Sequence, residues 1–173
     1  MMHRFWAGLV LAISALGCAA ETSQVSPTGF ISSFREELRV SPAQAWKAIV
    51  QLPVWWNDAH TWSGKASNMS LDLQAGGCWC ERWGEGRSVM HGQVVQVQPG
   101  LLVRMNASLG PLQELGAQGV LTIVTSAQEG KTFLRLTYRV AGGPETNLDK
   151  LAPAVDRVLS EQFKRLKALA EAD

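Results

Sequence analysis

The chain has 173 residues, a length that fits one domain and argues against a separate cofactor-binding module. Hydrophobic residues make up 46% and charged residues 18%, which is enough apolar material for a core and unlike the composition of a disordered chain. Sixteen Lys and Arg face fifteen Asp and Glu, and no basic run is present, so we expect no nucleic-acid partner.

The first twenty residues have the order of a secretory signal. Arg4 precedes an apolar run over 6–16 that is too short to cross a bilayer as a helix, and small residues follow it. The residues Ala15-Leu16-Gly17-Cys18 resemble a lipobox, in which Cys18 would be acylated. Cleavage near Ala20, acylation of Cys18 and retention as an anchor all stay open.

Each of these outcomes predicts an exported, periplasmic domain. A lipid on Cys18 would make it a membrane-anchored lipoprotein, and this is the only membrane contact that we expect. Residues 21–29 contain Ser, Thr and Pro and are interpreted as a flexible linker. The folded domain is expected to occupy 30–173.

The folded part begins with a strand and two short helices. Apolar and charged side chains alternate over 30–40, the period of a half-buried strand. Ser41 followed by Pro42 is typical of a helix N-terminus and predicts a helix to about Val50. Pro53 starts a second short helix that carries Trp55 and Trp56.

Six strands joined by short connections are predicted next. Glycine-containing turns separate most of them, so successive antiparallel hairpins are the expected topology. The predicted strands are 69–73, 78–83, 89–97, 101–108, 120–126 and 132–140.

The C-terminal part predicts one long amphipathic helix over 147–170, with apolar residues at three- and four-residue spacing. Pro153 either kinks this helix or starts its main body. The helix should lie across the sheet.

Several motifs accompany this order of elements, namely Val40-Ser41-Pro42-Ala43-Gln44-Ala45-Trp46, Pro53-Val54-Trp55-Trp56, Gly76-Gly77-Cys78-Trp79-Cys80-Glu81, His91-Gly92 and Leu109-Gly110-Pro111-Leu112. Together they resemble the SRPBCC superfamily, whose members are START-like proteins, and especially the bacterial branch named after the activator of the heat-shock chaperone ATPase. The resemblance covers about 30–170. It implies an α+β helix-grip fold, a curved antiparallel β-sheet wrapped around a long C-terminal helix, with two short helices after the first strand. It also implies an apolar cavity, but no shared catalytic motif.

The tryptophans are the main candidates for the cavity wall. All six that follow the signal lie between residues 46 and 83, and Trp46 is interpreted as ordinary packing. Pockets for small molecules combine apolar walls with a few polar groups. The candidate ligand-binding residues are Trp55, Trp56, Trp62, Trp79, Glu81, Trp83, Met90, Met105 and Tyr138.

A turn over 84–87 would set the register of the hairpin around it. Trp79 would then lie opposite Gly92, Cys80 opposite His91, and Glu81 opposite Met90. The face that we favour as inward carries Trp79, Glu81, Trp83, Met90 and Val94. The opposite face carries Cys78, Cys80, Arg82, His91 and Gln93, and the reverse orientation stays open.

Glu81 is the first candidate for acid–base chemistry, with His60 or His91 as its partner. In an apolar pocket, desolvation would raise the pKa of its carboxyl group. The alternatives are an ion pair with Arg104 or a solvated position at the rim.

The two cysteines of the hairpin are interpreted as inert. Cys78 and Cys80 lie two residues apart on one strand, where their Cβ atoms would be about 7 Å apart, too far for a disulfide. A zinc site that combines them with His91 lacks a fourth ligand. We therefore expect no metal and no cofactor.

The sequence as a whole favours an exported domain that binds a small hydrophobic molecule, which would be lipid, polyketide-like or aromatic. One alternative is a cyclase- or hydrolase-type enzyme that uses Glu81 with His60 or His91. Another is a chaperone-like protein-interaction module, for which the sequence names no partner.

Overall fold

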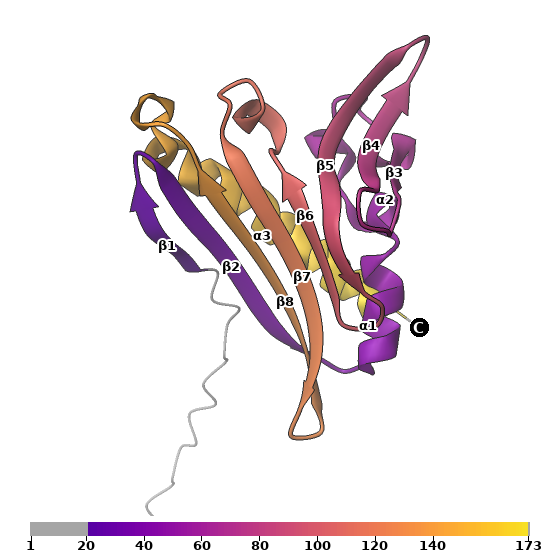
Figure 1. Cartoon of the computed structure of the whole chain (residues 1–173). Helices are drawn as coiled ribbons and strands as arrows, with labels where there is room; N and C mark the ends of the chain where they lie inside the picture. Colours follow the sequence, from indigo (N-terminus) through magenta and orange to yellow (C-terminus); the bar gives the residue numbers. More distant parts are fainter. Residues whose placement is uncertain (1–20, 173) are drawn as a thin grey trace, which may run out of the picture.

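The computed structural model describes residues 21–172, so the predicted signal over 1–20 and the candidate acylation site Cys18 lie outside the described residues. Eight antiparallel strands form one curved sheet, in the order β1-β2-β8-β7-β6-β5-β4-β3 (Figure 1). The strands are β1 (Glu21–Ser26), β2 (Gly29–Leu38), β3 (Met69–Leu71), β4 (Cys78–Trp83), β5 (Arg87–Gln98), β6 (Leu102–Ala107), β7 (Gln118–Gln128) and β8 (Lys131–Ala141).

The helices begin where the sequence provides N-terminal signals. In α1 (Pro42–Ile49), the Ser41 hydroxyl accepts a hydrogen bond from the Gln44 N–H at 3.2 Å, and Pro42 occupies the first turn. Helix α2 spans Leu52–Trp55 and α3 spans Leu148–Ala170, with Pro153 inside α3. Four short 3₁₀ segments complete the described chain: η1 (Asp58–His60), η2 (Ala66–Asn68), η3 (Gly110–Leu112) and η4 (Pro144–Thr146). Within 21–172, no helix combines the length and apolar character needed to span a membrane.

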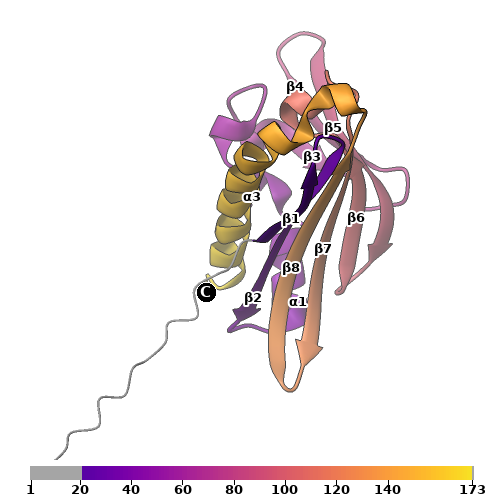
Figure 2. The ribbon, with the colours of Figure 1, turned by 90° about the vertical axis from the view of Figure 1, so that its left-hand side faces the viewer.

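The long helix α3 packs on the concave side of the sheet, which curves around it (Figure 2). Phe34 of β2 and Phe163 of α3 stack with ring centroids 5.6 Å apart, and both are buried. Burial of such apolar area supplies roughly 25 cal/mol per Å² and is the main favourable term in folding. The predicted α+β class, with a curved antiparallel sheet and a long C-terminal helix, is confirmed.

The segment that we expected to be a flexible linker, 21–29, instead supplies an additional strand. Its residues Glu21–Ser26 pair with β2, with Thr22 opposite Ser32. The backbone edge of β2 offers unpaired N–H and C=O groups that this segment satisfies, and polar residues are tolerated in such an edge strand.

The hairpin of β4 and β5 has a different register from the predicted one beyond its first pairs. Trp79 lies opposite Gly92, as expected, but a bulge then shifts Cys80 to Met90 and Glu81 to Val89. His91 is the extra residue of β5, so the predicted partners of Cys80 and Glu81 are wrong.

Because of the bulge, His91 and Met90 also face the opposite sides of the sheet from those predicted. His91 turns to the interior, with 3% of its surface exposed, whereas Met90 turns outward with 56% exposed. Gly92, the next residue, allows β5 to lie close to β6, because a Cβ at this position would lie 2.8 Å from the Cβ of Ala107 on β6.

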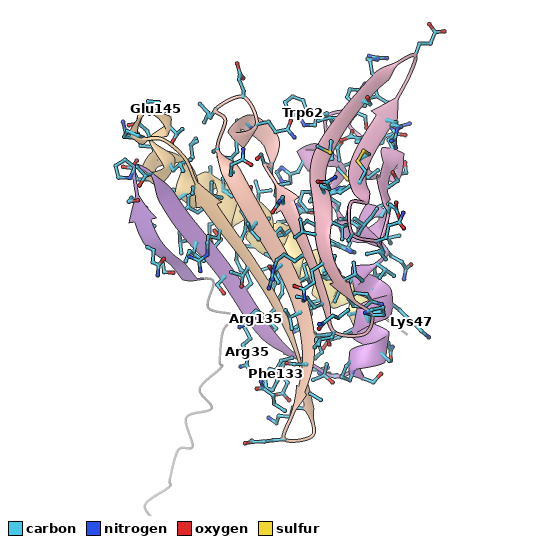
Figure 3. The ribbon with its side chains drawn as sticks, viewed as in Figure 1. Arg35, Lys47, Trp62, Phe133, Arg135 and Glu145 are labelled. Carbon is cyan, nitrogen blue, oxygen red and sulfur yellow. A yellow bond between two sulfur atoms is a disulfide. The ribbon has the colours of Figure 1, made fainter. Side chains whose placement is uncertain are left out.

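Cys78 and Cys80 are joined by a disulfide, so our interpretation of them as inert thiols is wrong (Figure 3). Their Cα atoms are 5.3 Å apart, less than the roughly 6.6 Å that two residues span in a regular strand. Strand β4 is therefore contracted between these two residues, next to the irregular pairing at Trp79 and Cys80.

Candidate functional site

A cavity of about 330 Å³ lies between α3 and the end of the sheet that carries the β4–β5 hairpin. Leu151, Val155 and Leu159 of α3 form one wall. Trp56 and Trp62 form another, and the loop at Leu109–Pro111 closes a third side. The lining is therefore mainly apolar.

His91 is the most deeply buried polar side chain of this lining. Its Nε2 lies 2.8 Å from Oε2 of Glu81, whose own surface is 0% exposed. Both residues come from the β4–β5 hairpin, and the bulge in β5 is what directs His91 to the same side as Glu81.

Glu81 also holds the chain segment at the cavity mouth. Its carboxylate accepts hydrogen bonds from the backbone N–H groups of Trp62, at 3.1 Å, and Ser63. Burial by itself raises the pKa of Glu81, but the hydrogen bonds to Ser63, Trp62 and His91 outweigh burial and leave the pKa below its ordinary value. We predicted a raised pKa, and that prediction is wrong because these donors stabilise the carboxylate.

The surroundings of the His91 ring favour its neutral form. Burial lowers its pKa, and the neighbouring Glu81 compensates only in part. Because an ionised carboxylate only accepts hydrogen bonds, Nε2 of His91 must be the protonated nitrogen that donates to Glu81. The other nitrogen, Nδ1, then carries a lone pair.

Trp79 packs against the His91 ring, and Trp56 packs against Trp79. The centroid of Trp79 lies 5.1 Å from the His91 ring and 4.8 Å from the centroid of Trp56, which it meets edge-on. Trp79 is completely buried, and its Nε1 has no hydrogen-bond partner within 21–172.

A second histidine, His60, lies at the rim of the same cavity. Its Nε2 is 3.1 Å from Glu161 of α3, which also accepts a hydrogen bond from the Asn57 amide. The hydrogen bonds from Asn57 and His60 lower the pKa of Glu161. This pair fastens η1 to α3 at the edge of the cavity.

The structure brings together part of the predicted set. Trp56, Trp62, His60 and His91 contribute to the lining. Trp55, Trp79 and Glu81 are buried but do not contribute to it; Trp79 and Glu81 contact His91 directly, and Trp55 contacts Trp56. Trp62 is 55% exposed and lies at the end of the molecule opposite to Arg35 and Phe133 (Figure 3).

The remaining candidates lie elsewhere. Met105 and Tyr138 are fully buried core residues. The Tyr138 hydroxyl donates to the Ala107 carbonyl at 2.8 Å and accepts from the Leu109 N–H at 3.2 Å, so it anchors the loop that closes the cavity. Trp83 is half-buried with the Arg87 guanidinium 6.0 Å from its ring centroid, and Met90 points outward.

The residues of α3 that form one wall of the cavity were not among the predicted ligand-binding residues. Leu151, Val155 and Leu159 belong to the apolar stripe of α3, whose periodicity places them on the inner face but does not separate cavity lining from solid core. Nothing in the local sequence distinguishes the two.

The described part of the chain contains no arrangement of side chains suited to metal or thiol chemistry. Over 21–172, no group of three or more His, Cys, Asp or Glu side chains is placed to hold a metal ion. The sulfur atoms of Cys78 and Cys80 are bonded to each other. The cavity is lined mainly by apolar side chains and by the imidazole of His91, which is hydrogen-bonded to the Glu81 carboxylate.

Comparisons with known proteins identify the fold and no function. No protein-family model matches the chain, and no curated protein is similar to it. Among solved structures, a protein from Arthrobacter aurescens has a TM-score of 0.59 at 14% identity, covering 90% of this chain and 91% of that one. Protein CV1439 from Chromobacterium violaceum has a TM-score of 0.55 at 16% identity over 83% and 98%. SA2116 from Staphylococcus aureus, described as a protein of unknown function, has a TM-score of 0.57 at 14% identity over 87% and 96%. The chain therefore shares a sheet-dominated α+β fold with these proteins.

Proposed function

We propose that this protein is a SRPBCC-type, helix-grip domain that binds a small hydrophobic molecule in the cavity beneath α3. The observation that carries the proposal is the cavity of about 330 Å³, whose walls are indole rings and aliphatic side chains. Pockets for small molecules have this composition and start at about this size.

We also propose that the domain is exported. The charged, apolar and small-residue order of 1–20 supports this location. The disulfide between Cys78 and Cys80 supports it independently, because such bonds persist in oxidising compartments and are rare in the cytosol. Cell fractionation with and without 1–20, with mass spectrometry of the mature N-terminus, tests export and acylation of Cys18 together.

Fluorescence tests ligand binding directly, because Trp56 and Trp62 line the cavity. Titration with the neutral apolar probe N-phenyl-1-naphthylamine should give a saturable change with a stoichiometry of one. Native mass spectrometry of protein purified from its own periplasm should show a retained organic molecule. The absence of both saturable probe binding and a co-purified molecule would contradict the proposal.

A second candidate function is acid–base catalysis, and the 2.8 Å contact of Glu81 with His91 favours it. A neutral imidazole oriented by a carboxylate is the arrangement of a general base. Turnover of p-nitrophenyl acetate that His91→Phe abolishes, with probe binding retained, would support a hydrolase. Equal turnover by both proteins would contradict it.

A further inference from the structure

The polar side chains that line the cavity differ in whether they have a hydrogen-bonding atom still available to a ligand. Thr61 already donates its hydroxyl proton to the Asp58 carbonyl at 2.7 Å. His60 lies at the rim, with Nε2 engaged by Glu161. His91 is the buried one, at 3% exposed, and only its Nε2 has a hydrogen-bond partner within 21–172.

The environment of Glu81 decides which proton His91 carries. Three hydrogen bonds converge on the carboxylate, two of them from backbone N–H groups that have no other protonation state. A carboxylate held in this way accepts only, so His91 donates through Nε2 and presents Nδ1 as an acceptor. The aromatic contacts from Trp79 keep the ring in this orientation.

We infer that the ligand of this cavity is a neutral hydroxylated aromatic compound, of the phenol or naphthol class, whose O–H donates to Nδ1 of His91. This inference rests on the proposed binding function and narrows it to a chemical class. The indole rings of Trp56 and Trp62 provide the aromatic surface, and His91 provides the polar contact.

Two physical arguments disfavour purely apolar and anionic ligands. A purely apolar ligand would bury the Nδ1 lone pair without a partner, at a cost of about 1 to 3 kcal/mol. An anionic ligand would lie near the buried carboxylate of Glu81 in surroundings where charge is poorly screened. A hydroxyl donor avoids both costs.

The experiment compares ligands that differ in one group. 2-Naphthol, 2-methoxynaphthalene and naphthalene-2-carboxylate displace bound N-phenyl-1-naphthylamine, and their dissociation constants are measured on the full folded domain. Because only 2-naphthol carries a hydroxyl donor without a charge, we expect it to bind about tenfold more tightly than either of the others. In His91→Phe the ratio of naphthol to ether should fall to about one. The exposed strand residue Gln98 provides a matched control, and Gln98→Ala should keep the wild-type ratio.

Nitrogen-15 NMR of the histidine side chains gives a second readout that needs no variant. His91 should show a protonated Nε2 and an unprotonated Nδ1, and 2-naphthol should shift the Nδ1 resonance most. Equal binding of the naphthol and the ether, tighter binding of the carboxylate, or a proton on Nδ1 in the free protein would each overturn the inference while leaving hydrophobic binding intact. If none of the three compounds binds, and the probe does not bind either, the proposed function is contradicted as well.

Discussion

Glu81 and His91 form a buried contact of 2.8 Å although they are not partners in the strand register. Glu81 lies opposite Val89, and His91 is the residue that the bulge leaves without a partner. The irregularity in β5 therefore creates the polar centre of the cavity. Bulges often redirect side chains in this way next to functional sites.

Replacing the carboxylate should destabilise the fold. In Glu81→Gln one of the two backbone donors, from Trp62 or Ser63, faces an amide N–H instead of an oxygen. We expect the free energy of unfolding in urea to fall by about 2 to 3 kcal/mol.

Glu37→Gln is the matched control, because Glu37 pairs with Lys131 at 2.8 Å with both side chains about half exposed. Its cost should be about 0 to 1 kcal/mol. Equal losses in the two variants would show that the buried hydrogen bonds of Glu81 contribute no more than a surface pair.

Stability should decrease in mild acid because of His91. Burial lowers the pKa of His91 below its ordinary 6.5, so just below that pH the unfolded chain binds a proton that the folded chain does not. The stability that neutral His91 contributes is fully present above about pH 6.5. It is lost as the pH falls through the lowered pKa, and the free energy of unfolding then decreases by up to about 1.4 kcal/mol per pH unit.

Urea titrations of wild type and His91→Phe at pH 7.5 and 5.5 measure this effect. The wild type should lose more stability than the variant between the two pH values. An identical loss would mean that His91 titrates in the folded protein as it does in the unfolded chain. The lowered pKa of Glu81 acts in the same direction, but only below its ordinary 4.5.

The disulfide should contribute modestly to stability and leave the fold intact. Because Cys78 and Cys80 close a very short loop, the chain-entropy model gives about 1 to 2 kcal/mol. The double variant Cys78→Ala with Cys80→Ala should lose that amount and keep its circular dichroism spectrum. In the unfolded wild type, alkylation of these cysteines before reduction would contradict the bond.

Periodicity predicted the architecture well because burial on one face leaves a local signature. The alternation over 30–40 corresponds to β2, and the three- and four-residue spacing after 147 corresponds to α3. Strand β1 was missed because the polar residues of 21–26 gain their order from the edge of β2, which is a tertiary effect.

The site was less predictable because it depends on one extra residue. A regular hairpin places His91 and Glu81 on opposite faces, and the bulge reverses that for His91. The disulfide between Cys78 and Cys80, beside this irregularity, was also not expected, because a regular strand would hold the two residues further apart. Tryptophan clustering identified Trp56 and Trp62, but it did not separate them from Trp55 and Trp79, which the fold places outside the lining.

A matched pair of alanine variants on α3 tests the cavity most directly. Both residues are exposed, but Ala154 contributes to the lining of the cavity, whereas Ala168 lies further along the same helix and outside the lining. Phenylalanine at 154 should cover the opening through which a ligand enters, and at 168 it should extend into solvent.

Isothermal titration calorimetry with N-phenyl-1-naphthylamine is the deciding measurement. Ala168→Phe should bind the probe as wild type does, and Ala154→Phe should bind it at least about tenfold more weakly with an unchanged midpoint of unfolding. Equal affinities in all three proteins would place the bound molecule outside this cavity and contradict the account.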